Sequence, residues 1–79
     1  MTNEQKLFQA IADVFRINIE MVSIDSSPDN IKKWDSLGII QLVSELESVF
    51  DVQFELLEIA DFQNVAIIKS ILAEKGVIF

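Results

Sequence analysis

The N-terminal part of the chain follows a helical pattern of apolar and polar residues. Apolar side chains recur at three- and four-residue spacing, at Leu7, Phe8, Ile11, Val14 and Phe15. Thr2 and Gln5 have the form of a capping box, in which each side chain accepts a hydrogen bond from the other residue's backbone N–H. These signals predict a helix over about residues 3 to 16 with one buried face.

The pattern loosens over residues 18 to 33. Here the apolar residues are isolated, and they are Ile19, Val22, Ile24 and Ile31. The polar run from Asp25 to Asn30 interrupts them and contains the single proline of the chain. This composition predicts a long loop that a few apolar side chains pin to the core.

A helical pattern returns after the pentapeptide Trp34-Asp35-Ser36-Leu37-Gly38. Asp35 can accept a hydrogen bond from a first-turn N–H, which makes Trp34 and Ile39 the two ends of a hydrophobic staple. The predicted core stripe of this second helix is Ile39, Val43, Leu46 and Phe50, with Leu42 and Val49 beside it. The helix should end near Asp51.

Two more helices are predicted in the C-terminal third. The run from Glu55 to Ala60 suggests a helix of one to two turns, and Asn64 offers the N-cap of a longer one that stops at Gly76. The buried stripe of this last helix is Val65, Ile68, Ile71 and Leu72. We therefore expect a single all-α domain over residues 1–79, an antiparallel bundle of three longer helices and one short helix, with a long loop between helices I and II. The pattern predicts no element for the apolar tail, Val77 to Phe79.

The net charge of −7 arises from one segment of the chain. Residues 34 to 68 contain no Lys or Arg, and their acids are Asp35, Glu45, Glu47, Asp51, Glu55, Glu58 and Asp61. Such a field disfavours nucleic acid and anionic membranes as partners and favours enzymes with basic surfaces. The alternative is a solvated acidic face that only aids solubility.

The composition argues against an enzyme. The chain has no Cys and no His, so it lacks a thiolate nucleophile, the commonest general base and the commonest metal ligand. A domain of 79 residues is also small for a catalytic cleft. We expect no catalytic residue and no metal site. With no leader pattern and no long apolar run, we expect a cytoplasmic monomer.

A second stripe on the predicted second helix descends from Ser36. Its positions are Leu37, Ile40 or Gln41, Ser44, and Glu47 or Ser48, with Glu45 and Glu47 at its rim. Because Leu37 and Ile40 are apolar on a face that should meet water, we interpret this docking strip as a partner surface that contributes little to folding.

The triplet Asp35-Ser36-Leu37, followed by Leu42-x-x-x-Leu46-Glu47-x-x-Phe50, resembles the attachment site of acyl carrier proteins, and the resemblance spans about residues 4 to 75. In that family the serine carries 4′-phosphopantetheine, which a separate phosphopantetheinyl transferase donates from coenzyme A with Mg²⁺. The resemblance implies that Ser36 is the attachment residue, with Asp35 and Leu37 beside it. It also implies a helical bundle whose arm holds acyl groups as thioesters and presents them to partner enzymes.

Two features depart from fatty-acid carriers. Gly38 stands where those carriers usually have an acidic residue, and Val49 interrupts their acidic run. Trp34 before the triplet resembles carriers of specialised pathways, such as surface polysaccharide or secondary-metabolite assembly. By propensity alone, Gly38 should cost about 1 kcal/mol of helix stability relative to alanine.

Two alternatives stay open. An aminoacyl or peptidyl carrier would use the same serine and arm but usually sits in a large multidomain chain, so a complete chain of this length favours the discrete form. A small acidic interaction module would have no prosthetic group, and Ser36 would only start a helix.

The short third helix should be the most easily opened part of the bundle. Its acids lie close to those at the end of the second helix, and no cation occurs between residues 34 and 68 to relieve the repulsion. Its movement would admit an acyl chain into a space lined by Ile39, Leu46, Ile59 and Ile68.

Overall fold

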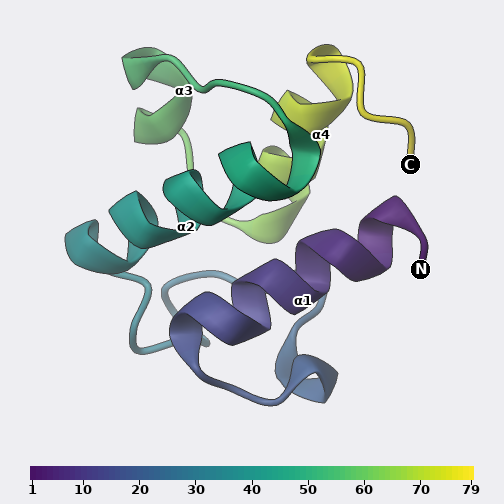
Figure 1. Cartoon of the computed structure of the whole chain (residues 1–79). Coiled ribbons are helices and arrows are strands. Elements are labelled where there is room, and N and C mark those ends of the chain that lie inside the picture. Colours follow the sequence, from purple (N-terminus) through teal and green to yellow (C-terminus); the bar gives the residue numbers. More distant parts are fainter.

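The computed structural model covers residues 1–79 and is built from helices alone (Figure 1). The elements are α1 (Asn3–Phe15), the 3-10 turn η1 (Ile19–Met21), α2 (Ser36–Phe50), α3 (Leu56–Ala60) and α4 (Val65–Glu74). Helices α1 and α2 lie side by side with opposite directions, and α3 and α4 lie above α2 in this view. The predicted all-α fold of three longer helices and one short helix, with a long loop after α1, is confirmed.

Local capping signals define where the helices begin. Thr2 and Gln5 form the predicted capping box, with Gln5 N donating to Thr2 Oγ1 at 3.1 Å and Thr2 N donating to Gln5 Oε1 at 2.9 Å. The N-cap Asn64 accepts from Ile67 N at 2.8 Å. Helices α1 and α2 end before left-handed residues, Arg16 with φ 56° and Asp51 with φ 54°. Helix α1 ends one residue earlier than predicted, α3 begins one residue later, and α4 ends at Glu74, two residues before Gly76.

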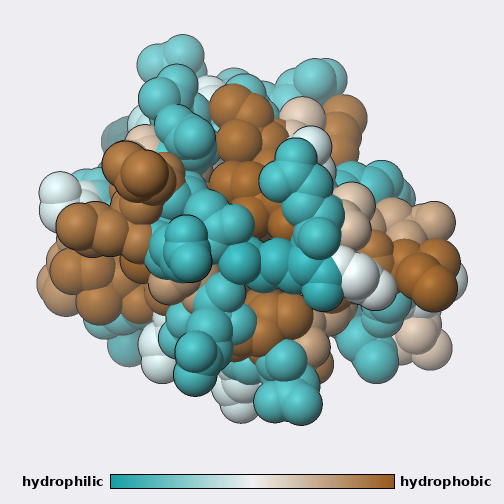
Figure 2. Space-filling view, turned by 90° about the horizontal axis from the view of Figure 1, so that it is seen from above, coloured by the Kyte–Doolittle hydropathy of each residue, from teal (hydrophilic) through white to brown (hydrophobic).

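One hydrophobic core lies between α1, α2 and α4. Its fully buried helical residues are Leu7, Ile11 and Phe15 of α1, Leu42 and Leu46 of α2, and Val65, Ile68 and Leu72 of α4. The predicted stripe of α4 is confirmed. The apolar side chains left outside this core form separate surface patches (Figure 2).

The predicted stripe of α2 is partly wrong. Gly38 and Leu42 are buried with Val43 and Leu46, whereas Ile39 and Phe50 are only half-buried and Val49 is 40% exposed. The buried face of α2 is thus centred about one residue earlier in the sequence than predicted, on the side that meets α1. The close approach of α1 to α2 at Gly38 explains this, because it brings Leu42, one turn later, into the core.

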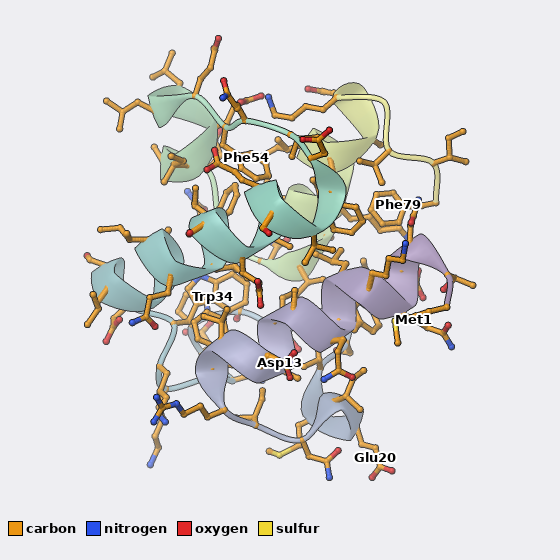
Figure 3. The ribbon with its side chains drawn as sticks, in the orientation of Figure 1. Met1, Asp13, Glu20, Trp34, Phe54 and Phe79 are labelled. Atoms are coloured by element: carbon orange, nitrogen blue, oxygen red, sulfur yellow. The ribbon has the colours of Figure 1, made fainter.

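Trp34 joins three segments of the chain (Figure 3). It is 4% exposed, its ring stacks on Phe15 with centroids 5.5 Å apart, and its Nε1 donates to Phe62 O at 3.0 Å. The prediction assigned Trp34 only a staple with Ile39. In the structure Trp34 fixes the loop before α2 against the end of α1 and the segment before α4.

The long loop is pinned to the core and also caps α4. Val22 and Ile31 are buried, as predicted, whereas Ile24 is largely exposed. Val65 N donates to Ser26 O at 3.0 Å and Ala66 N donates to Ile24 O at 3.2 Å. These bonds satisfy first-turn donors of α4 that have no partner within the helix.

The C-terminal tail, for which no element was predicted, packs back onto the bundle. The Phe79 ring lies 6.3 Å from that of Phe50, and Lys69 Nζ lies 5.2 Å from the centre of the Phe79 ring. Asn3 Nδ2 donates to Ile78 O at 2.9 Å. The tail therefore contacts the start of α1, the end of α2 and the middle of α4, and Phe79 lies near the N-terminus in Figure 3.

Candidate functional site

Ser36 is the first residue of α2, and it is exposed. The preceding Asp35 caps the helix as predicted, because its Oδ1 accepts from Gly38 N at 2.8 Å. The Ser36 hydroxyl forms no hydrogen bond within the chain, and no basic side chain is bonded to it. A serine nucleophile is ordinarily activated by an adjacent base, and no such base is bonded to this oxygen within the chain. The geometry offers an exposed hydroxyl on a fixed helix end.

Gly38 explains how that helix end is fixed. The residue is buried, and an added Cβ would lie well under 3.0 Å from Lys33 O and 2.7 Å from Phe15 Cε1. The first turn of α2 therefore packs directly on the loop backbone and on the last residue of α1. The prediction treated Gly38 as a departure from fatty-acid carriers and as a cost to helix stability, with no packing role. The structure corrects this, since no larger residue fits without moving the loop that leads to Ser36.

The docking strip is accessible along α2. Leu37 is 65% exposed and Ile40 is 64% exposed, and Gln41 and Ser44 are exposed beside them. Glu45 is half-buried and has no ion-pair partner. The structure therefore places these predicted residues together on the outer face of α2.

Helix α3 adds two residues that the sequence reasoning missed. Leu56 and Leu57 are 82% and 81% exposed, so two large apolar side chains of this short helix face water. Apolar side chains gather at the end of the molecule where α3 and the start of α2 lie (Figure 2). A helical-periodicity search treats such residues as core, because it cannot show which of the two faces is covered.

Glu47 has a structural partner. Its Oε2 accepts from Phe54 N at 2.9 Å, and the side chain is half-buried. This bond ties α2 to the segment that leads into α3. The expectation that Glu47 contributes little to folding is therefore wrong, although its position beside the docking strip is as predicted.

The charges on α3 are partly compensated from outside the acidic segment. Lys75, just after α4, forms an ion pair with Glu58 at 2.7 Å, and Glu55 N donates to Glu58 Oε1 at 2.8 Å. The hydrogen bond from the Glu55 backbone, and then the bond from Lys75, hold the pKa of Glu58 below its ordinary value. The expectation of unrelieved repulsion is wrong at Glu58, because a distant residue supplies the cation.

A shallow hollow of about 210 Å³ adjoins the serine. Its lining residues are Val14, Phe15, Arg16, Lys33, Asp35, Leu37, Gly38 and Gln41. Ser36 is not one of them, but its chain neighbours Asp35 and Leu37 are. No group of carboxylates in the structure could hold a metal ion, and no helix is both long and apolar enough to cross a membrane.

Residues 5–68 match the family model described as the phosphopantetheine attachment site. The chain belongs to this family. Its members carry 4′-phosphopantetheine covalently, are not themselves enzymes, and work with a phosphopantetheinyl transferase and with pathway enzymes. The search of curated proteins gave no match. Family membership therefore favours a carrier over an acidic module without a prosthetic group.

The carrier has no preformed chamber lined by the four residues predicted to shelter an acyl chain. Leu46 and Ile68 are fully buried, Ile39 and Ile59 are half-buried, and none of them lines a surface hollow. Shelter of an acyl chain would require α3 to move away from the bundle. That movement stays a prediction.

Proposed function

We propose that the chain is an acyl carrier protein in which Ser36 bears the 4′-phosphopantetheine arm. The observation that supports this most strongly is the exposed Ser36 hydroxyl, free of hydrogen bonds, at the start of α2 and within the matched residues 5–68. When bound, the group supplies a flexible arm ending in a thiol that forms thioesters. A chain without cysteine thereby gains the thiol that its function needs.

The residues around Ser36 fit such an attachment. The hydroxyl is open to a transferase, and space for a substituent adjoins it. Asp35 caps the helix, while Gly38 and Trp34 hold the preceding loop in place. These residues present one oxygen in a defined position, and the transferase supplies the base that removes its proton.

Partner enzymes would dock on the strip that begins beside the serine. We assign this role to Leu37, Ile40, Gln41, Ser44, Glu45 and Glu47, with Glu47 also stabilising the fold. Exposed apolar side chains beside carboxylates suit an enzyme surface with an apolar contact ringed by Lys or Arg. An arm that ends in a free thiol needs a reducing compartment, so we place this function in the cytoplasm.

The structure gives a physical basis for the departures from fatty-acid carriers. Gly38 is required by the close contact with Lys33 O and cannot be replaced by an acidic residue without rearrangement. Val49 is 40% exposed at the end of α2 and lowers the charge there. Val49 supports a carrier of a specialised pathway, such as polysaccharide or secondary-metabolite assembly, because partners that read an acidic face would meet a different surface there.

The test is loading of the purified chain by a phosphopantetheinyl transferase with coenzyme A. Intact mass should rise by one phosphopantetheinyl group in the wild type and in Ser70→Ala, which removes an exposed serine of α4 outside the docking strip. Ser36→Ala should gain no mass while retaining the wild-type circular dichroism spectrum. A mass gain that persists in Ser36→Ala would refute the assignment. Incubation of the loaded chain with acyl and aminoacyl donors then separates an acyl carrier from an aminoacyl carrier.

A further inference from the structure

Two cationic side chains, those of Arg16 and Lys33, line the hollow beside Ser36. Arg16 follows α1 and Lys33 belongs to the loop before α2, so residues distant in sequence meet at one surface feature. Asp35 and Leu37, the neighbours of Ser36 on either side, also line it. Ser36 itself does not line the hollow, but both of its chain neighbours do, so a substituent on the Ser36 oxygen begins close to it.

Neither cation is neutralised by the protein. The two salt bridges of the structure use Lys69 with Glu4 and Lys75 with Glu58. Arg16 and Lys33 thus remain unpaired in a chain of net charge −7. Asp35 is the only acid that lines the hollow, and its Oδ1 already accepts from Gly38 N. Two free cations around one hollow in an acidic protein indicate a site for an anion.

The anion that can reach this site without diffusing is a phosphodiester on Ser36. A guanidinium binds two oxygens of a phosphate at once, and a Lys ammonium adds a point charge. Contacts between exposed charges are weak when the partners diffuse freely. A covalent link keeps the phosphate close to the hollow, so its effective concentration there is high and weak contacts suffice.

We propose that Arg16 and Lys33 bind the phosphodiester of the phosphopantetheine arm at this hollow. The arm then leaves Ser36 on the side of α1, away from the exposed Leu56 and Leu57 of α3. Partner enzymes would meet an arm with a preferred direction. This inference rests on Ser36 being the attachment residue.

The experiment compares two doubly substituted carriers of equal charge by ³¹P NMR after loading. Arg16→Gln with Lys33→Gln removes both cations of the hollow, whereas Lys6→Gln with Lys32→Gln removes two exposed cations that do not line it. Thermal melting checks that both variants fold. In the wild type, the phosphodiester resonance should be displaced from its position in urea-unfolded protein, and added salt should reduce the displacement. The hollow variant should lose the displacement, and the control variant should keep it.

Each result bears on a distinct claim. Absence of any mass gain on loading would overturn the Ser36 assignment and this inference together. A mass gain with the same phosphodiester resonance in all three proteins would overturn the inference alone. The inference is also overturned if the hollow variant changes only the KM for coenzyme A during loading, because the cations would then serve the phosphates of the donor and not the attached arm.

Discussion

Replacement of Gly38 by alanine tests whether this glycine is tolerated or required. By helix propensity alone, Gly38→Ala should stabilise α2 by about 1 kcal/mol. In the structure the new methyl group meets Lys33 O and Phe15 Cε1, both well inside ordinary contact distance. Overpacking of this kind costs roughly 1–3 kcal/mol, and displacement of the loop would weaken the Asp35 cap, which is worth about 1 kcal/mol.

The sum of these effects is a destabilisation of Gly38→Ala by about 1–3 kcal/mol. For a domain of this size each kcal/mol lowers the Tm by roughly 4–8 °C, so the shift is easily measured by circular dichroism. Fluorescence of Trp34, the single tryptophan, reports on the same loop. Loading of Ser36 by the transferase should also slow, because the loop before it has moved.

Two alanine variants serve as controls. Gly76→Ala adds a methyl group in open space but at φ 100°, so any loss there reflects backbone strain alone, of roughly 1–2 kcal/mol. Ser44→Ala lies on an exposed part of α2 and should be neutral or slightly stabilising. A Gly38→Ala protein that melts higher than the wild type, with unchanged loading, would refute the packing argument.

Four further outcomes are expected. Trp34→Phe should destabilise the domain by about 1–3 kcal/mol in urea titrations, because a buried carbonyl loses its indole donor. Glu45→Lys should slow loading by a basic partner, most at low salt, with little change in Tm. Glu47→Lys should slow loading in the same way and should also lower the Tm, because a backbone N–H loses its acceptor. The pKa of Glu58 is lowered in the folded state, so its ionised form stabilises the wild type relative to Glu58→Gln above pH 4.5, and this advantage should vanish as the pH falls through the folded pKa. Amide exchange in residues 55 to 62 should be faster than in the three longer helices, because no residue of α3 is buried; equal protection throughout the chain would contradict this.

The helices could be predicted because their signals are local. A capping box needs residues three apart, and Thr2 with Gln5 shows both of its bonds. Asp35 and Asn64 likewise bond N–H groups three residues ahead. The periodic apolar residues of α4 are all buried, because one continuous stripe leaves a helix a single way to face the core.

The features that were predicted wrongly or missed depend on partners far away in the sequence. The indole of Trp34 finds its acceptor 28 residues ahead, and the role of Gly38 depends on the backbone of the preceding loop. Glu58 forms its ion pair with Lys75, which follows α4 in the sequence. Periodicity and charge counts describe one segment at a time, so they gave the wrong face for part of α2 and too much repulsion for α3.

The start of α2 and helix α3, which border the same apolar patch, are held in different ways (Figure 2). Ser36 follows a loop fixed by a stacked Trp34 and a contact at Gly38 that admits no extra atom. Helix α3 has five residues, none of them buried, and the ion pair of Glu58 with Lys75 is its main polar tie to the bundle. A carrier that serves several enzymes needs the arm to start from a constant position, while the surface around it adapts to each partner. The rigid packing before Ser36 meets the first requirement, and the light attachment of α3 meets the second. Substitutions at Gly38 should therefore impair every partner reaction, whereas substitutions in α3 should impair particular ones.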